Sequence, residues 1–440
     1  MNRTVIVTLG PVVFASFVAA ASAACSSEPS PAPVAGADPT VPPGAPSAPP
    51  VGPPAQVGDA APIPVFDAGS DASALADASA DASTDAALAD AGPPVVHPPL
   101  LVGRFETTDP QGPRAAWPGA RILTQFEGTS VSVTLREIAD AWMIGAPGFW
   151  EVKIDDGAWV PIEMIPDGQP HVFSLGTNLP FGEHRVELYK RSETQNGVTQ
   201  FLGFDFHGGR SLPPPPRQLR KIEVMGDSQA TGFGIEMLDA PNLDCPGADH
   251  GGRWQNFRKS WGALLGERFD AEVHGIVYSG KGVVRNIWPG DDDTLVRYYP
   301  RANPNPALQN SNPQLFDLQS WIPDVIVLTH GSIDFGAGAT YEEFRAGYRS
   351  FVLDQLRARS ASTHIFLSVL GRGGRAAIPQ IAEELRTERL AAGDDRIHVF
   401  VAQDYVWTEM VACNGHGTPA WHQRIAGELA AAIGTRLGWN

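Results

Sequence analysis

The stretch "VMGDSQATGFG" (residues 224–234) decides the fold of the C-terminal half of the chain. An apolar run ends there at Gly226, and Asp227 and Ser228 follow before a glycine-rich turn. A polar residue at a junction between a strand and a helix commonly caps the helix. A serine in the same place can also be a nucleophile, so Ser228 has two interpretations that the rest of the sequence must separate.

From residue 219 onward, short apolar runs alternate with helical patterns. The runs cover 221–226, 272–279, 324–331, 364–371 and 397–403, and the helical stretches fall near 258–268, 341–358, 376–391 and 419–437. This alternation predicts an α/β domain over 219–440, with a doubly wound parallel sheet and helices on both faces. In such a sheet, active residues lie in loops after the carboxyl ends of strands.

Residues 99–212 have a different pattern. Seven or eight short runs rich in β-branched and aromatic residues are separated by turn formers such as Asp156-Gly157. Strands at this spacing predict a small β-sandwich domain. The proline-rich segment at 211–218 then indicates a short, stiff linker to the α/β domain.

The N-terminal part of the chain predicts export. Residues 1–25 join an apolar stretch to a small-residue end, which is typical of a secretory signal. Cys25 follows directly and could carry a lipid, with simple secretion and a transmembrane anchor as the alternatives. Residues 26–98 are rich in Pro, Ala and Asp and predict a disordered linker. This linker supplies about half of the net charge of −17. The acidic balance of the chain argues against nucleic-acid binding.

The other two of the chain's three cysteines are Cys245 and Cys413. Exported thiols tend to be oxidised, so the two could form a disulfide. Two free, buried thiols are the alternative.

Four segments carry the residues that a serine hydrolase needs. They are Ser228 after the first strand, "YSGKGVVRN" (278–286), "THGSIDFG" (329–336) and "CNGHGTPAWHQRIAGEL" (413–429). All four should meet at one edge of the sheet. Hydrolysis by a serine requires a general base near its oxygen and donors for the oxyanion, which a histidine and a glycine-rich loop can provide.

These segments resemble the conserved blocks of the SGNH (GDSL) hydrolases, and within them the family 2 carbohydrate esterases. The resemblance covers roughly residues 100–438. It implies a jelly-roll β-sandwich followed by a flavodoxin-like SGNH domain, and removal of acetyl groups from polysaccharides such as xylan and glucomannan. Residue by residue, it implies that Ser228 is the nucleophile, Gly280 an oxyanion-hole donor and His416 the general base. Ser228 itself would give the other oxyanion N–H, and Asp227 would shape the turn.

Two positions depart from the family pattern. Cys413 and Asn414 stand where related enzymes have an aspartate that orients the histidine. We therefore expect a Ser–His dyad in which a backbone carbonyl, that of Gly415, holds the imidazole. Ile333 occupies the position of the oxyanion-hole asparagine, and His330 is either a packed histidine or a replacement polar group at the substrate site.

Other candidate residues have simpler explanations. Trp288, Trp407 and Trp421 could line a sugar-stacking cleft or belong to the core, and Trp288 lies closest in sequence to a catalytic block. The run Asp291-Asp292-Asp293 indicates a solvated loop rather than a cation site. His416 and His422 do not have a recognised zinc spacing, so we predict neither a metal nor an organic cofactor.

Together these features predict an exported, monomeric O-acetyl esterase whose partner is an acetylated polysaccharide. It would touch a membrane only through a lipid at Cys25. Two alternatives stay open. One is a carbohydrate-binding protein with a decayed esterase domain, motivated by Ile333 and Asn414. The other is an SGNH esterase acting on lipid or peptidoglycan acetyl esters.

Overall fold

The computed structural model describes residues 96–138, 146–239, 245, 252–304, 314–370 and 376–440. The predicted signal segment (1–25) and nearly all of the predicted linker (26–98) lie outside these residues. The chain divides into two units, Met1–Asp85 and Ala86–Asn440, and everything described below belongs to the second. Among the helices in the described ranges, none has the length and apolar character that crossing a membrane requires.

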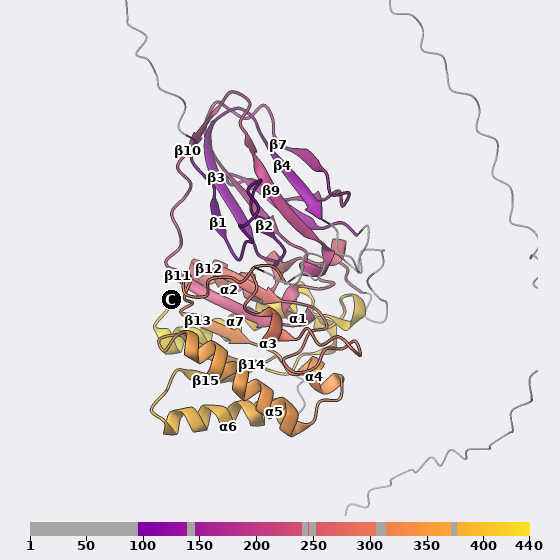
Figure 1. Cartoon of the computed structure of the whole chain (residues 1–440), viewed down its shortest axis with the longest axis vertical. Coiled ribbons are helices and arrows are strands. Elements are labelled where there is room, and N and C mark those ends of the chain that lie inside the picture. The colour runs from indigo at the N-terminus through magenta and orange to yellow at the C-terminus, as the bar shows by residue number, and fades with distance from the viewer. Residues whose placement is uncertain (1–95, 139–145, 240–244, 246–251, 305–313, 371–375) are drawn as a thin grey trace, which may run out of the picture. The chain divides into compact units, whose positions relative to one another are not determined.

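The N-terminal domain is a sandwich of two antiparallel sheets (Figure 1). One has the order β1-β3-β8-β5-β6, with β10 also beside β3, and the other has the order β2-β9-β4-β7. Along β4, Val131, Val133 and Leu135 alternate with less buried residues and pack with Phe126 and Val186 of the facing sheet. The predicted β-sandwich is therefore confirmed. Its strands are β1 (Leu100–Val102), β2 (Arg114–Ala115), β3 (Arg121–Gly128), β4 (Val131–Ile138), β5 (Phe149–Ile154), β6 (Val160–Glu163), β7 (Pro170–Gly176), β8 (Gly182–Lys190), β9 (Val198–Asp205) and β10 (Arg210–Leu212).

The C-terminal domain contains a five-stranded sheet in which every pairing is parallel. The strands are β11 (Arg220–Gly226), β12 (Ala271–Val277), β13 (Val325–Leu328), β14 (His364–Val369) and β15 (Ile397–Val401). Their order, β12-β11-β13-β14-β15, is the flavodoxin-like order of a doubly wound fold. The predicted fold is confirmed, and the carboxyl ends of β11, β12 and β13 lie side by side.

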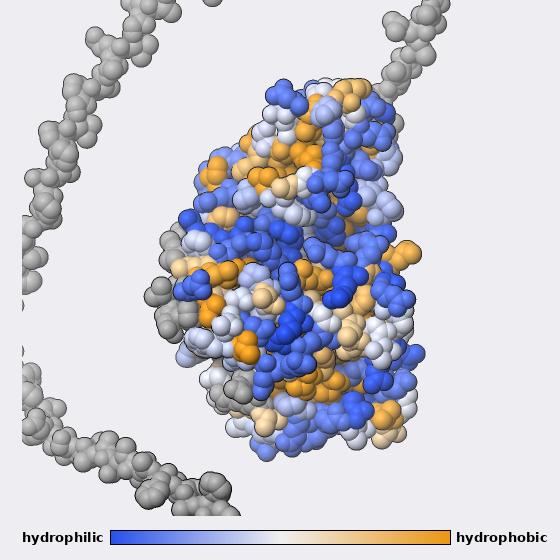
Figure 2. All heavy atoms as spheres, turned by 180° about the vertical axis from the view of Figure 1, so that it is seen from behind, coloured by the Kyte–Doolittle hydropathy of each residue, from blue (hydrophilic) through white to orange (hydrophobic). Residues whose placement is uncertain are grey.

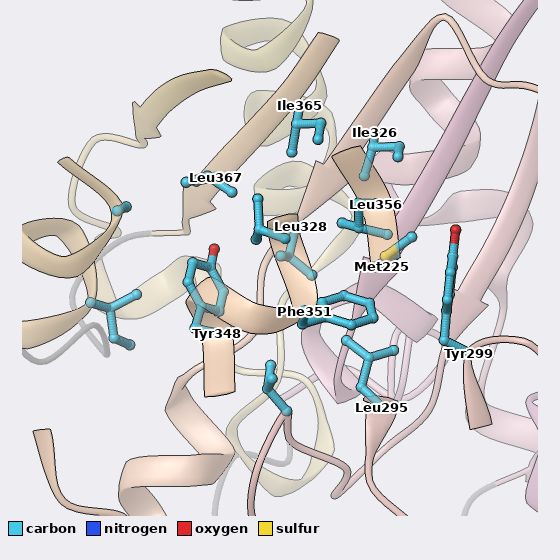
Figure 3. Close-up of a cluster of buried hydrophobic side chains, with 14 of the residues drawn as sticks. Met225, Leu295, Tyr299, Ile326, Leu328, Tyr348, Phe351, Leu356, Ile365 and Leu367 are labelled. Atoms are coloured by element: carbon cyan, nitrogen blue, oxygen red, sulfur yellow. The ribbon is translucent and has the colours of Figure 1, made fainter. Parts of the chain in front are cut away.

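Helices cover both faces of this sheet, as predicted. They are α1 (Ser228–Thr231), α2 (Trp261–Phe269), α3 (Leu295–Tyr298), α4 (Ser332–Gly336), α5 (Tyr341–Ser350), α6 (Ala377–Ala391) and α7 (Pro419–Leu437), and a π-helical stretch, η5 (Phe351–Arg357), continues α5. On β13, Val325 and Val327 face the cluster that includes α2 and α7. Ile326 and Leu328 face the opposite cluster, with α5, η5 and α6 (Figure 3). Strands buried on both faces explain the continuous apolar runs in the sequence.

A buried ion cluster joins the two domains. Arg104, which follows β1, donates to Glu223 on β11 at 2.9 Å, and Arg359 donates to the same carboxylate at 2.8 Å. All three side chains are at most 2% exposed. A second contact runs from Asn256 Nδ2 to Glu151 Oε1 on β5, at 2.9 Å. The domains therefore share a polar interface as well as a linker.

The molecular face in Figure 2 is mostly hydrophilic, with apolar residues interspersed among polar ones. The large apolar side chains that are most exposed, such as Phe181 and Leu219, lie far apart in the sequence. Scattered apolar residues of this kind are normal for a protein surface.

Candidate active site

Ser228 lies at the turn where β11 gives way to α1. Asp227 is the N-cap of α1, because its carboxylate accepts a hydrogen bond from the Gln229 N–H at 3.1 Å. Burial raises the pKa of Asp227 to about 6, and the nearby Asp334 carboxylate adds to this effect. Within the described residues, the half-buried Ser228 hydroxyl makes no hydrogen bond. The capping role thus belongs to Asp227, and the hydroxyl of Ser228 stays available for chemistry.

Two backbone N–H groups are the predicted oxyanion donors. The Ser228 N–H is at the first position of α1, where a helix offers no internal acceptor. Gly280 follows β12, has φ of +74°, and its N–H donates to no described residue. A Cβ on Gly280 would lie 2.4 Å from the ring of Trp288, so only glycine fits beneath this indole. Trp288 is 37% exposed and covers the loop of the predicted oxyanion donor.

Asp334 fixes the Gly280 loop from the catalytic domain. Its buried carboxylate accepts hydrogen bonds from the N–H groups of Val283, Val284 and Arg285, at 3.1, 2.7 and 3.1 Å. A Cβ on Gly282 would lie 2.7 Å from this carboxylate, so the close approach needs glycine there. The third sequence block therefore holds the second block in place.

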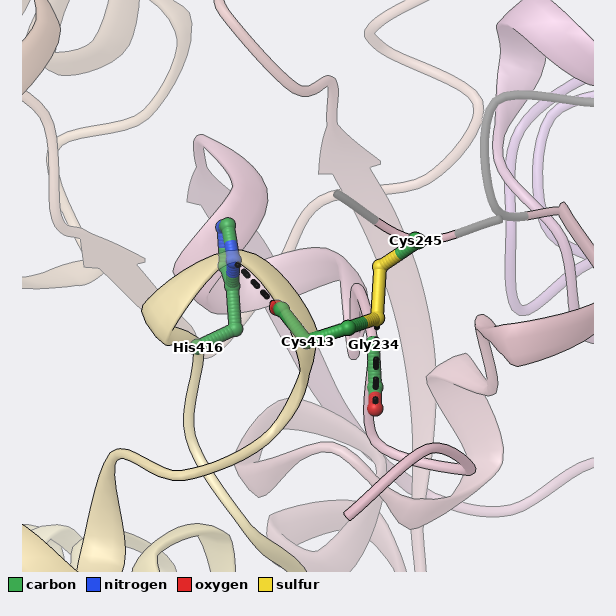
Figure 4. The surroundings of a disulfide bond; sticks show 4 residues. All are labelled: Gly234, Cys245, Cys413 and His416. Carbon is green, nitrogen blue, oxygen red and sulfur yellow. Dashed lines mark hydrogen bonds between the residues drawn. A yellow bond between two sulfur atoms is a disulfide. The ribbon is translucent and has the colours of Figure 1, made fainter. Parts of the chain in front are cut away.

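His416 follows η7 (Cys413–Gly415) and precedes α7. Its Nδ1 lies 3.3 Å from the Cys413 carbonyl oxygen (Figure 4). A carbonyl acceptor at Nδ1 places the proton there and leaves Nε2 as the base. Burial lowers the pKa of His416 to about 4, although the carbonyls of Cys413 and Asn414 favour the protonated form. The imidazole is therefore neutral at pH 7.

The prediction that the Gly415 carbonyl holds His416 was wrong, because the contact comes from Cys413. The reason is the turn at Asn414, whose φ of +58° and ψ of 29° are left-handed. Asparagine tolerates this conformation better than most residues. The Asn414 side chain is exposed, so it shapes the loop and does not orient the imidazole.

A disulfide between Cys245 and Cys413 attaches the histidine loop to the segment after α1 (Figure 4). The Cys413 N–H also donates to the Met237 carbonyl at 2.9 Å. The ring of Phe233 lies 4.7 Å from the ring of His416, measured between centroids. These contacts bring the histidine loop against the serine turn. Within the described part of the chain, however, no hydrogen bond joins Ser228 to His416, and such bonds are often loose without substrate.

A cavity of about 220 Å³ lies beside these residues. It is lined by Asp227 and Gln229, on either side of Ser228, by Gly415, next to His416, and by His330, but not by Ser228 or His416 themselves. Two larger cavities, of about 550 and 480 Å³, lie near the amino ends of β11 and β12. That is the edge of the sheet opposite to the one where such folds bind ligands.

The structure places His330 in the wall of the small cavity. The side chain is 1% exposed, and neither ring nitrogen has a partner among the described residues. Burial lowers the pKa of His330 to about 3, so the ring is neutral. Ile333 is half-buried in the first turn of α4 and offers no donor. His330 is therefore available to a ligand in the cavity, whereas Ile333 provides only apolar surface.

Other candidates lie elsewhere or have partners. The buried ring of His422 accepts the Trp261 N–H at 3.2 Å. The three consecutive aspartates pair with Lys281, Arg297 and Arg301, at 2.7, 2.6 and 2.8 Å. Trp407 is 65% exposed, and Trp421 is buried and lines the small cavity.

Comparison with known proteins finds relatives of both domains. The family model "Carbohydrate esterase 2 N-terminal" matches residues 101–216. Cellulase/esterase CelE of Acetivibrio thermocellus is 27% identical over 344 residues, 77% of this chain. An acetylxylan esterase / glucomannan deacetylase of Cellvibrio japonicus is 26% identical over 352 residues, 77% of this chain and 89% of that protein. A family two carbohydrate esterase from Clostridium thermocellum, solved in complex with cellohexaose, has a TM-score of 0.69 at 26% identity, covering 78% of this chain and 100% of that one.

The chain resembles the family 2 carbohydrate esterases. The resemblance spans both the sandwich and the parallel sheet, as the sequence motifs predicted. The aligned part corresponds to 40% of the length of CelE.

In this carbohydrate-esterase-like chain, sequence reasoning missed two residues at the site. One is Asp334, whose acceptor role follows from its place in the third block. The other is Glu193 of the sandwich domain, which accepts hydrogen bonds from Ser279, next to Gly280. No local motif marks Glu193, because its partner is 86 positions further along the chain.

Proposed function

We propose that the protein is a carboxylic ester hydrolase that removes O-acetyl groups from polysaccharide, with Ser228 and His416 as a catalytic dyad. The observation that carries the proposal is the arrangement around Ser228. Ser228 begins α1 with an available hydroxyl, and its neighbours Asp227 and Gln229 line one cavity with Gly415, which precedes His416. A disulfide ties down the histidine loop. The names of the relatives, which include acetylxylan esterase and glucomannan deacetylase, support acetylated xylan or glucomannan as the substrate.

In the proposed reaction, Ser228 Oγ attacks the acetyl carbonyl carbon while His416 Nε2 takes the hydroxyl proton. The N–H groups of Ser228 and Gly280 stabilise the oxyanion. When the bond to the sugar oxygen breaks, His416 returns the proton to that oxygen and the acetyl group stays on Ser228. Water then attacks the acetyl-serine, gives a proton to His416, and acetate leaves as Ser228 recovers its hydrogen.

The histidine has no carboxylate partner in this scheme. The Cys413 carbonyl selects the tautomer but stabilises the imidazolium less than a carboxylate would. Burial lowers the pKa of His416, and the backbone carbonyls oppose this only in part. We therefore expect a functional but slow dyad, made slower because Ile333 offers no third oxyanion donor.

Acetate release tests the proposal. The full-length protein should release acetate from acetylated xylan or acetylated glucomannan, and Ser228→Ala should abolish this, since losing one member of such a unit typically costs about a millionfold. Activity that survives Ser228→Ala would refute the assignment. Release from acetylated peptidoglycan alone would favour the peptidoglycan alternative, and polysaccharide binding without any acetate release would favour the decayed-enzyme alternative.

We also propose that the protein is exported and works outside the cytoplasm, anchored by a lipid at Cys25 or free. The Cys245–Cys413 disulfide supports an oxidising compartment. Cell fractionation with mass spectrometry of the mature N-terminus tests this, and an intact Met1 on cytoplasmic protein would contradict it.

A further inference from the structure

Glu193 of the sandwich domain reaches the loop that carries Gly280. It precedes the short helix η1 (Thr194–Asn196), and its side chain is fully buried. Glu193 Oε2 accepts the backbone N–H of Ser279, and Oε1 accepts the Ser279 hydroxyl, both at 2.7 Å. Its own N–H donates to Gln255 Oε1 at 3.0 Å, which holds Glu193 at the domain boundary.

Ser279 directly precedes Gly280, and the peptide between them carries the Gly280 N–H. Two hydrogen bonds to one residue fix both its position and its rotation, because the backbone and the side chain are held at once. On the far side of this peptide, the Gly280 carbonyl accepts the Ile287 N–H at 2.9 Å. Asp334 holds the next residues of the loop. The loop is therefore held from the catalytic domain by Asp334 and from the sandwich by Glu193.

We propose that Glu193 is a positioning residue that aims the Gly280 N–H at the oxyanion, so that the sandwich domain takes a direct part in catalysis. The inference rests on the proposed esterase function. It gives the N-terminal domain a role in turnover besides any contact with polysaccharide.

The charges around Glu193 make the role testable. The Lys190 ammonium and the Asp227 carboxylate interact electrostatically with the Glu193 carboxylate. Lys190 also interacts with the Glu137 carboxylate. Burial raises the pKa of Glu193 to about 7, while the Ser279 hydrogen bonds and Lys190 oppose that rise and Asp227 adds to it. The ionised carboxylate accepts both Ser279 donors. Protonation turns one carboxylate oxygen into a donor, so Glu193 can no longer accept both Ser279 hydrogen bonds. Turnover should therefore decline as the pH falls through about 7.

The decisive comparison is between variants of two similar carboxylates. Glu193→Ala removes both contacts to Ser279, and Glu193→Gln keeps an acceptor for the Ser279 N–H. Glu137→Gln is the matched control. Glu137 is equally buried in the same domain, and burial also raises its pKa to about 7, but it bonds Thr199 rather than the loop. Each variant is assayed as full-length protein on p-nitrophenyl acetate, with its melting temperature recorded.

We expect Glu193→Ala to lower kcat about 10- to 100-fold with KM changed less than threefold, because a misaimed donor loses transition-state stabilisation. The kcat of Glu193→Gln should fall by no more than half as much as that of Glu193→Ala, on a logarithmic scale. The kcat of Glu137→Gln should stay within threefold of wild type. The kcat profile of the wild type should show a shoulder near pH 7 that is absent in Glu193→Gln. In Glu137→Gln the shoulder should remain but move to lower pH, because Lys190 then acts on Glu193 without the competing Glu137 charge. The remaining acid limb should then lie below this shoulder, where Asp227 (pKa about 6) and His416 (pKa about 4) become protonated.

Equal losses in Glu193→Ala and Glu137→Gln would overturn the inference, as would a kcat for Glu193→Ala within threefold of wild type. If Glu193→Ala does not fold, the pH shoulder of Glu193→Gln decides alone. If the wild-type protein has no esterase activity, or if its activity survives Ser228→Ala, the proposed function itself is refuted. The two failures are therefore distinguishable.

Discussion

Removing the Cys245–Cys413 disulfide should destabilise the protein strongly and slow catalysis only modestly. The bridge closes a loop between residues 168 positions apart. In the chain-entropy description, a loop of that length removes roughly 17 cal/mol/K from the unfolded state, or about 5 kcal/mol at 25 °C. With an m-value of about 3 kcal/mol/M, the urea midpoint should fall by roughly 1.7 M in the Cys245→Ala/Cys413→Ala double variant.

Catalysis should suffer less because the backbone contacts of the histidine loop do not depend on sulfur. The Cys413 carbonyl still faces His416 Nδ1, and the Cys413 N–H still donates to Met237. We expect kcat to fall less than about tenfold. Urea titrations followed by tryptophan fluorescence give the midpoint, and p-nitrophenyl acetate gives kcat.

Dithiothreitol provides the control. It should shift the wild-type midpoint toward that of the double variant and leave the double variant unchanged. A double variant whose midpoint lies within 0.3 M of the oxidised wild type would refute the entropy argument. A loss of kcat above about a hundredfold would show that the bridge itself sets the geometry of His416.

Three further changes probe the site. Ile333→Asn should raise kcat at least about tenfold with KM nearly unchanged, because a new oxyanion donor acts mainly in the transition state. If kcat does not rise and His330→Leu lowers kcat, then His330 is already the third oxyanion donor. Asn414→Gly should leave kcat within threefold of wild type, while Asn414→Ala should lose about 1 kcal/mol of unfolding free energy to the left-handed turn; a thousandfold loss of kcat in both would make the amide a true third catalytic member. Trp288→Ala should raise KM for acetylated polysaccharide several-fold and leave KM for p-nitrophenyl acetate unchanged, and equal effects on both substrates would instead indicate a role in supporting Gly280.

The elements that sequence analysis predicted well are those buried on a regular period. The run at 221–226 became β11 (Arg220–Gly226), and the helical pattern at 419–437 became α7 with the same limits. The short strands β1, β2 and β10 were missed because two or three residues are too few to show an alternation of apolar and polar side chains. Their pairing is decided by neighbouring strands instead.

Sequence analysis could predict a candidate site residue where its position depends only on the strand that precedes it. Ser228 and Gly280 lie two and three residues after strands β11 and β12, whose ends the fold places side by side. The carbonyl that faces His416 was assigned to the wrong residue, because the left-handed turn at Asn414 does not show in the letters alone. Glu193 was invisible for another reason. Its hydrogen bonds cross a domain boundary, and no spacing rule describes such a contact.

The buried cluster of Arg104, Glu223 and Arg359 limits how this protein can be taken apart. Cutting the chain at the linker would remove Arg104 and leave Arg359 to pair with Glu223, at a face that the sandwich domain no longer covers. The α/β domain is therefore a poor module to express alone or to fuse to a foreign sugar-binding domain. For the same reason, recombination that exchanges one domain should succeed only when both sides of this ion cluster are inherited together.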